Sequence, residues 1–191
     1  MSHVFDAKKL AKLDNPRRKE LIPQDQILSL LGVKAGEQVL DVGCGIGFLT
    51  LPAAKMVGDT GFVYGVDIQE GMLVEALDRS KQEKLFTIAW VLTHPDKITL
   101  PSASVDCAML GMVAHEAPDL TQMLAECRRV LKQGGRIGVV EWNQTFTEMG
   151  PPLDHRLKPE TLQDILIKLG FGETVVHDIS LGVYLAVGTK K

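Results

Sequence analysis

The sequence predicts an α/β fold in which helices cover both faces of a doubly wound, mostly parallel sheet that ends in an antiparallel hairpin. First, short apolar runs of strand length alternate with longer segments whose apolar residues recur at helical spacing. Second, the last two apolar runs, 173–179 and 183–188, lie too close together for a crossover helix, so they must pair antiparallel. Third, 191 residues with 45% apolar content suit a single domain, 1–191, with a substantial core.

The first half of the chain reads as strand and helix units that follow an N-terminal segment. Residues 1–34 are expected to form a helical cap or lid on a core of residues 35–191. A helix in this cap ends at Gly32, because glycine accepts the left-handed conformation of a C-terminal cap. Apolar side chains of the cap are expected to help wall a ligand site; they are Phe5, Leu10 and Leu13. Strands are expected at 39–42, 62–66 and 87–92, and helices at 24–31, 47–56 and 69–83.

The second half continues the alternation and supplies four of the seven expected strands. Apolar residues between Leu120 and Val130 recur at helical spacing, and Gly170 stops a helix that begins near Pro159. These strands are expected at 105–110, 136–141, 173–179 and 183–188, and the helices at 120–131 and 159–169.

Glycines at alternate positions join the first strand to its helix. Gly43, Gly45 and Gly47 leave so little side-chain bulk that a ligand can lie directly against the backbone. The spacing differs from the dinucleotide fingerprint Gly-x-Gly-x-x-Gly, since the third glycine comes one residue early and Phe48 stands in its place. An acid, Asp41, precedes the glycines. A tight turn without a ligand is the alternative, but three alternating glycines after an acid favour contact with a cofactor.

Three ordered segments together resemble a known enzyme class. The run from Asp41 to Gly47 resembles motif I of the class I S-adenosylmethionine-dependent methyltransferases. The second strand then ends in Asp67, one βα unit later. Residues 131–142 resemble the leucine-lysine-proline-glycine-glycine start of the fifth strand in that class, with Gln133 in place of the proline. The resemblance covers about residues 35–142 and is strongest to the ubiquinone/menaquinone-biosynthesis methyltransferase-like group.

The resemblance implies a Rossmann-like, seven-stranded fold and a cofactor. That cofactor would be S-adenosylmethionine, converted to S-adenosylhomocysteine as its methyl group passes to a small-molecule acceptor. Arsenic as acceptor is disfavoured, because the cysteines are placed as packing residues. Two alternatives remain from other classes: a catalytically idle regulatory module that binds S-adenosylmethionine, and a nucleotide-dependent oxidoreductase. The early third glycine and the terminal hairpin speak against the oxidoreductase.

Cofactor contacts are expected beyond the carboxyl ends of the strands, where open sheets of this kind bind ligands. The resemblance implies that Asp67 accepts hydrogen bonds from ribose hydroxyls and that Asp41 orders the loop or reaches the methionine ammonium. Asp67 could instead cap the next helix. His94 stands where many members carry an adenine-binding acid, and its neutral ring keeps one acceptor nitrogen; a role in an exposed loop, or replacement by Asp96, stays open. The full set is Asp41, Gly43, Cys44, Gly45, Gly47, Asp67, Ile68, His94, Pro95 and Leu110.

Catalytic and acceptor-binding candidates follow the fourth and fifth strands. His115 is the candidate general base for a hydroxyl or amine acceptor. Glu116 orients this base or begins the next helix. His155 and Arg156 lie in a loop that closes over substrate in related enzymes, with an ordinary surface loop as the alternative. Candidate acceptor contacts are Met112, Glu116, Trp142, His155 and Arg156, and Met112 with Val113 is expected to wall the site.

Composition excludes several other classes of protein. Three cysteines, an odd number, indicate reduced thiols, and neither Cys-x-x-Cys nor a histidine pair at metal-binding spacing is present, so no metal site is expected. A net charge of −3 offers nucleic acid no attraction, and the basic run 17–19 is expected to be a solvated helix face. No apolar run is long enough to span a membrane, and the chain opens without a signal-like leader, so a cytoplasmic location is expected. The pattern leaves the oligomeric state open.

Overall fold

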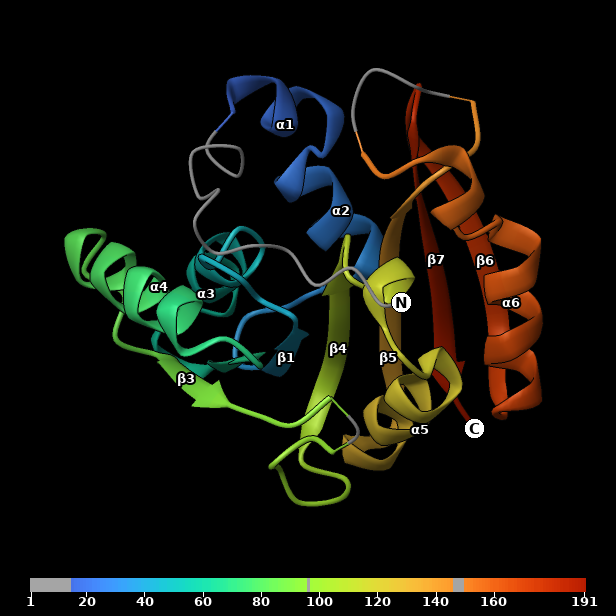
Figure 1. Ribbon diagram of the computed structural model, residues 1–191. Coiled ribbons are helices and arrows are strands. Elements are labelled where there is room, and N and C mark those ends of the chain that lie inside the picture. Colours follow the sequence, from blue (N-terminus) through green and yellow to red (C-terminus); the bar gives the residue numbers. More distant parts are fainter. Residues whose placement is uncertain (1–14, 96, 146–149) are drawn as a thin grey trace.

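The computed structural model describes residues 15–95, 97–145 and 150–191 and confirms the expected α/β architecture (Figure 1). Its strands are β1 (Gln38–Val42), β2 (Phe62–Asp67), β3 (Ile88–Leu92), β4 (Val105–Gly111), β5 (Leu131–Trp142), β6 (Phe171–Ser180) and β7 (Val183–Lys190). They form one sheet in the order β3-β2-β1-β4-β5-β7-β6. Pairing is parallel from β3 to β5, whereas β7 runs antiparallel to both β5 and β6. The order reverses between β1 and β4, which is where such sheets bind ligands.

Helices cover the sheet and build a core on each of its faces. The α-helices of the described residues are α1 (Pro16–Leu21), α2 (Gln24–Leu31), α3 (Thr50–Val57), α4 (Glu70–Gln82), α5 (Leu120–Val130) and α6 (Pro159–Lys168). Because successive strand residues point to opposite faces, Val39 packs with α2 and α3, while Leu40 packs with α5 and α6. Short 3₁₀ turns are η2 (Gly58–Thr60), η3 (Ala114–Glu116) and η4 (Leu153–His155).

The predicted elements are present, and two of them begin several residues away from their expected first residue. The helix after β1 begins at Thr50, three residues after the expected start, because Gly47 has a φ of +84° and cannot be helical. Strand β5 begins at Leu131, five residues early, and pairs with β4 through an irregularity between Val105 and Cys107. Helix α1 lies in the expected helical cap and begins at Pro16, where the Asn15 side chain accepts a hydrogen bond from the N–H of Arg17.

Helix α2 of the N-terminal segment packs into the core on one face of the sheet. Helix α2 buries Ile27, Leu28 and Leu31 in the core that it shares with α3. It ends at Gly32, whose φ of +72° is the left-handed conformation expected there. The lid residues Phe5, Leu10 and Leu13 lie outside the described residues. Within the described part of the chain, no helix has the length and apolar character needed to cross a membrane.

Candidate functional site

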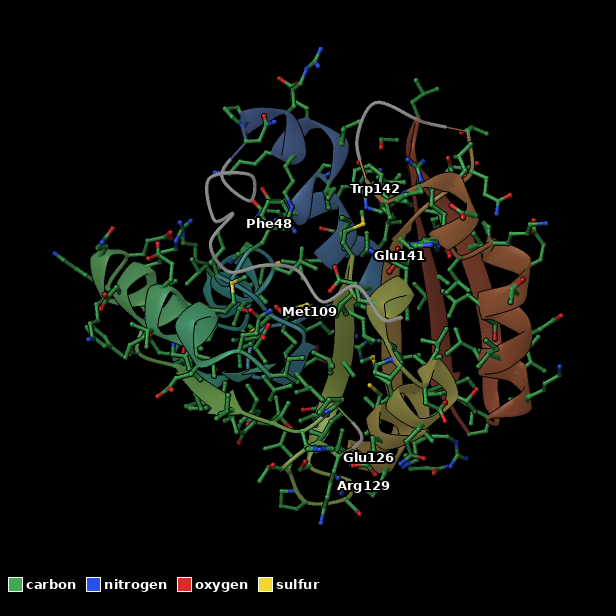
Figure 2. The ribbon with its side chains drawn as sticks, viewed as in Figure 1. Phe48, Met109, Glu126, Arg129, Glu141 and Trp142 are labelled. Atoms are coloured by element: carbon green, nitrogen blue, oxygen red, sulfur yellow. The ribbon has the colours of Figure 1, made fainter. Side chains whose placement is uncertain are left out.

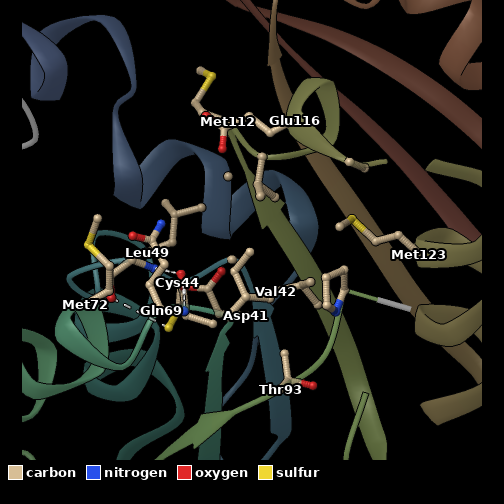
Figure 3. A pocket seen from close by; sticks show the side chains of 18 of the residues that line it. Asp41, Val42, Cys44, Leu49, Gln69, Met72, Thr93, Met112, Glu116 and Met123 are labelled. Carbon is tan, nitrogen blue, oxygen red and sulfur yellow. Dashed lines mark hydrogen bonds between the residues drawn. The ribbon is translucent and has the colours of Figure 1, made fainter. Parts of the chain in front are cut away.

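A cleft opens at the carboxyl ends of β1, β2 and β4, at the reversal of strand order. Its empty space, counted to the open mouth, is about 1260 Å³. Figure 3 shows Met112 and Glu116 at one end of the cleft and Thr93 at the other. Apolar side chains supply much of the wall, among them Phe48, Leu49, Met72, Ile98, Val113 and Met123.

The loop after β1 requires glycine for two separate reasons. Gly43, Gly45 and Gly47 have φ angles of +65°, +53° and +84°, which other residues rarely adopt. A Cβ atom on Gly43 would also lie 2.5 Å from Cγ2 of Val113, so the loop packs tightly against the segment after β4. A Cβ atom on Gly45 would meet nothing within 4 Å, and Gly45 lines the cleft. The loop therefore packs tightly against Val113 at Gly43 and leaves space for a ligand at Gly45.

Asp67, at the end of β2, holds the glycine loop with its carboxylate. Oδ2 accepts a hydrogen bond from the N–H of Gly45, and Oδ1 accepts one from the N–H of Gln69, both at 2.9 Å. Burial raises the pKa of Asp67, and the hydrogen bonds that it accepts from backbone N–H groups oppose that rise. Helix α4 receives no side-chain cap bond, so Asp67 is not its N-cap. Each carboxylate oxygen keeps a second lone pair, which leaves Asp67 able to accept a ligand hydroxyl in the cleft.

Asp41 lies beneath the loop, at the end of β1, and is only 2% exposed. Its Oδ2 accepts a hydrogen bond of 2.6 Å from the hydroxyl of Thr50, the first residue of α3. Burial raises the pKa of Asp41 to about 7; the Thr50 hydroxyl opposes the rise, and the nearby Asp67 adds to it. The carboxyl group thus joins strand to helix across the loop and exchanges its proton near neutral pH.

The other expected cofactor residues divide between the cleft and the core. Leu110 is fully buried and packs with α5 and α6, so it does not line the cleft. Gly47 faces the ring of Trp90, which a Cβ atom there would approach to 2.9 Å. Asp96, the alternative adenine contact, lies outside the described residues. The residues that line the cleft as expected are Cys44, Ile68, His94 and Pro95.

His115 is paired with Glu141, a fully buried acid near the end of β5. Figure 2 labels Glu141 beside Trp142, the last residue of that strand. Nδ1 of His115 lies 2.8 Å from Oε2 and 3.0 Å from Oε1 of Glu141, and the N–H of His115 donates to Oε1 at 3.1 Å. Oε1 of Glu116 is 3.8 Å from Nε2 of the same ring. The acid that orients the ring is therefore Glu141, not the adjacent Glu116, for which the sequence left this role open beside a place at the start of the next helix.

The surroundings of His115 set its charge. Burial alone would lower the pKa of His115, but the hydrogen bond and charge of Glu141, helped by Glu116, raise it above the ordinary value; Arg156 acts against them. Since Nδ1 faces Glu141, Nε2 is the ring atom left to exchange a proton. Glu116 lines the cleft, whereas His115 does not.

The expected acceptor residues are likewise split. Met112 lines the cleft with a φ of +60°, which is uncommon for a residue with a side chain. Arg156 is buried, and its guanidinium donates to the carbonyls of Asn143 and Pro151, both at 2.9 Å. The guanidinium carbon of Arg156 also lies 5.7 Å from the ring centroid of Trp142. Trp142, His155 and Arg156 do not line the described cleft, and His155 is exposed.

Two contributors to the site carried no usable motif in the sequence. Glu141 appeared there only as the last residue of the expected strand 136–141, and no spacing rule links it to His115. Arg18 belongs to the basic run expected to be solvated, yet it lines the cleft with its guanidinium carbon 4.3 Å from the ring centroid of Phe48. Phe48 itself was visible as the departure from the dinucleotide spacing, which was the one available signal.

The cysteines behave as packing residues. All three are free and buried, as expected from their odd number; they are Cys44, Cys107 and Cys127. Burial raises the pKa of the Cys107 and Cys127 thiols to about 12, so neither is poised as a nucleophile. Among the residues that the structure describes, no group of three or more histidine, cysteine or acidic side chains is placed to hold a metal ion.

Comparison with known proteins agrees with the geometry. A sequence profile of the ubiE/COQ5 methyltransferase family matches residues 19–152. The ubiquinone/menaquinone biosynthesis C-methyltransferase UbiE of Laribacter hongkongensis is 29% identical over 82% of this chain and 75% of its own length. The 2-phytyl-1,4-naphtoquinone methyltransferase of Nostoc punctiforme is 38% identical over 58% of this chain, and the match spans about half (49%) of that protein. The crystal structure of a SAM-dependent methyltransferase from Aquifex aeolicus matches with a TM-score of 0.93 and 30% identity, covering 98% of this chain and 100% of that one.

Proposed function

Because the chain belongs to the ubiE/COQ5 methyltransferase family and is a SAM-dependent methyltransferase, we propose that its cleft holds the donor along the glycine loop and a small apolar acceptor beside it. The observation that carries this proposal is the bond between Asp67 and the N–H of Gly45. It brings a hydroxyl-accepting carboxylate and exposed backbone together in one cleft. S-adenosylmethionine supplies a methyl group that its sulfonium already makes electrophilic.

The residues of this chain fit that donor in three ways. Asp67 offers acceptor lone pairs for ribose hydroxyls, and the open position at Gly45 lets a ligand approach the backbone. Ile68 and Pro95 supply apolar surface for a base, and His94 supplies a polar edge beside them. Asp41 keeps the loop in place through Thr50. Their common task is alignment, because transfer to a nucleophile held near the methyl carbon gains several kcal/mol from proximity alone.

The acceptor that suits the remaining wall is an aromatic hydroxy compound of the quinol type. Met112, Val113 and Met123 give the cleft an apolar, adaptable surface. The Laribacter relative is named as a C-methyltransferase of ubiquinone and menaquinone biosynthesis, and the Nostoc relative as a 2-phytyl-1,4-naphtoquinone methyltransferase. A dry wall also favours the reaction, since the positive charge of the donor is dispersed as the methyl group moves to its acceptor.

His115 is the proposed general base, and Glu116 is the acid that the acceptor meets in the cleft. Because Glu141 occupies Nδ1 and His115 itself does not line the cleft, the proton of the acceptor would pass by way of Glu116 to Nε2 of His115. The buried thiols and the net charge of −3 support a reducing, cytoplasmic setting and no nucleic-acid partner.

Calorimetric titration tests the donor site. We expect S-adenosylhomocysteine to bind the purified protein and NADH to give no signal. Asp67→Ala should weaken S-adenosylhomocysteine binding by about 1 to 3 kcal/mol, since it leaves hydroxyls and the Gly45 N–H without their acceptor; Asp67→Asn, which keeps one acceptor oxygen, should lose less. Binding of NADH alone, or an unchanged dissociation constant in Asp67→Ala, would contradict the proposed site.

Methyl transfer tests the acceptor class. We expect protein incubated with methyl-labelled S-adenosylmethionine to label a reduced, hydroxylated naphthalene but not the oxidised quinone, which has no hydroxyl proton to give up. Donor binding without label in any hydroxylated aromatic compound would instead favour the idle regulatory module.

A further inference from the structure

The cleft is rich in acids and carries little positive charge. Four acidic residues line it, namely Asp41, Asp67, Glu116 and Glu126. Of the lining residues that the structure describes, Arg18 is the only lysine or arginine. The donor of the proposed function, on which this inference rests, has a sulfonium, an ammonium group and one carboxylate. The acids suit its two cations, whereas its carboxylate needs a cation or free N–H groups to replace water.

Arg18 is held over the part of the loop where that carboxylate is needed. Its guanidinium carbon lies 4.3 Å from the ring centroid of Phe48, the residue that follows the third glycine. The side-chain amide of Gln24 donates to the carbonyl of Phe48, so α2 is tied to the same residue. The charge of Arg18 also acts on Asp41, where it opposes the rise in pKa that burial causes. Helix α1 therefore docks against the loop with its guanidinium in the cleft.

The direction of the donor in the cleft follows from Asp67. With ribose hydroxyls at the end of β2, the base extends toward Thr93 and His94, beyond the end of β3. The amino-acid portion leaves the ribose on the opposite side, and so passes over the loop after β1. Phe48 lies at the far end of that loop, with Arg18 against its ring.

We propose that Arg18 binds the carboxylate of the methionine portion of the donor and thereby fixes the end of the molecule remote from the base. The guanidinium can pair with a carboxylate through two parallel N–H bonds, while its planar face stays on the Phe48 ring. The product keeps the same carboxylate and is held in the same way. The N-terminal helix α1 then senses whether the amino-acid portion is present.

Two ligands that differ only in this portion test the proposal. S-adenosylhomocysteine carries the amino-acid group, and 5′-methylthioadenosine shares its thionucleoside but lacks the amine and carboxylate. In calorimetric titrations we expect Arg18→Ala to bind S-adenosylhomocysteine about 10- to 100-fold more weakly, the loss typical of a charge-assisted pair, and 5′-methylthioadenosine within about 2-fold of the natural chain. Arg18→Lys keeps the positive charge but loses the planar guanidinium that can form two parallel bonds. Its affinity for S-adenosylhomocysteine should therefore lie between those of the natural chain and of Arg18→Ala.

Arg17→Ala is the matched control, because Arg17 is the neighbour of Arg18 on α1 and does not line the cleft. It should leave both ligands unaffected. Equal weakening of both ligands by Arg18→Ala would show that the side chain supports the cleft in general and would overturn the proposal, as would unchanged binding of S-adenosylhomocysteine. If the natural chain bound 5′-methylthioadenosine but not S-adenosylhomocysteine, the carboxylate would be repelled and the proposal would fail while the nucleoside site stood. Binding of neither ligand would instead contradict the proposed function.

Discussion

The carboxyl group of Asp41 lies beneath the glycine loop with a pKa of about 7. Near pH 6.5 much of it is protonated in the free protein. A donor that brings positive charge into the cleft favours the ionised form and so lowers this pKa. We expect S-adenosylmethionine binding near pH 6.5 to release a fraction of a proton, measured by calorimetry in buffers of different ionisation enthalpy. Asp41→Asn should abolish the release, and the natural chain should lose it near pH 8.5, where Asp41 is already ionised.

The pair of His115 and Glu141 gives a second titration, in which removal of a carboxylate changes the pKa of a histidine. The carboxylate of Glu141 raises the pKa of His115, and burial acts against it. Glu141→Gln keeps the shape and removes the charge, so the pKa of His115 should fall. Nuclear magnetic resonance of the imidazole protons measures this shift without requiring activity. If His115 is the base, the alkaline rise of the methyl-transfer rate should move to lower pH by the same amount.

The same pair links stability to pH. A histidine whose folded-state pKa is raised stabilises the fold fully below its ordinary pKa, and the contribution is lost as the pH rises through the raised value. Glu141→Gln should therefore flatten the fall in unfolding free energy on the alkaline side of neutrality. An unchanged pH profile together with an unchanged His115 titration would show that the contact does not persist in solution.

The glycine loop offers a test in which backbone strain and side-chain collision are separated. Gly43 and Gly45 both have positive φ angles, so alanine at either position incurs the same kind of strain. Only at Gly43 would the new methyl group meet Val113. We expect Gly43→Ala to lower the free energy of unfolding by about 1 to 3 kcal/mol more than Gly45→Ala, measured by urea denaturation. Adding Val113→Ala should recover much of the difference, and equal losses at the two glycines would contradict the packing.

Strand and helix order followed from local patterns, whereas the exact ends of elements did not. Gly32 and Gly170 ended their helices as expected, because a C-terminal cap is a property of a few neighbouring residues. The early start of β5 depends on its pairing with β4, and the periodicity of the sequence does not contain that information. Helix α3 starts late for a similar reason: Gly47 takes a conformation that serves the loop, not the helix.

One arginine ties the beginning of the chain to its centre. Arg136, on β5, donates to the carbonyls of Leu31 and Gly32 at 2.9 Å and to the carboxylate of Glu37 at 2.7 Å. It thereby satisfies the last carbonyls of α2, more than 100 residues away in sequence. Arg136→Ala should lower the free energy of unfolding by about 2 kcal/mol, and Arg136→Lys, which cannot form the fork, should lose part of it. Urea denaturation gives both values, and a loss below about 0.5 kcal/mol would contradict the contact.

The side of the cleft formed by the glycine loop and Asp67 was predictable because its residues follow strand ends along the chain. Asp41, Gly45 and Asp67 can be recognised from their positions at or after strand ends, without knowledge of the rest of the fold. The other end was not, because it depends on pairs brought together across the sheet. Glu141 meets His115 from 26 residues away, and Arg18 meets Phe48 from a helix without a motif. Single-sequence patterns describe neighbours in the chain, and these pairs are neighbours only after folding.

The C-terminal hairpin lines no part of the described cleft, yet it lies beside Glu141, the acid that pairs with His115. Tyr184 of β7 pairs directly with Glu141 in the sheet, and it is fully buried with its hydroxyl bonded to the carbonyl of Leu157. While this strand is in place, water is kept from the acid. If warming frayed the hairpin first, hydration would weaken the hold of Glu141 on His115, and turnover would fade at temperatures where the donor site was still intact.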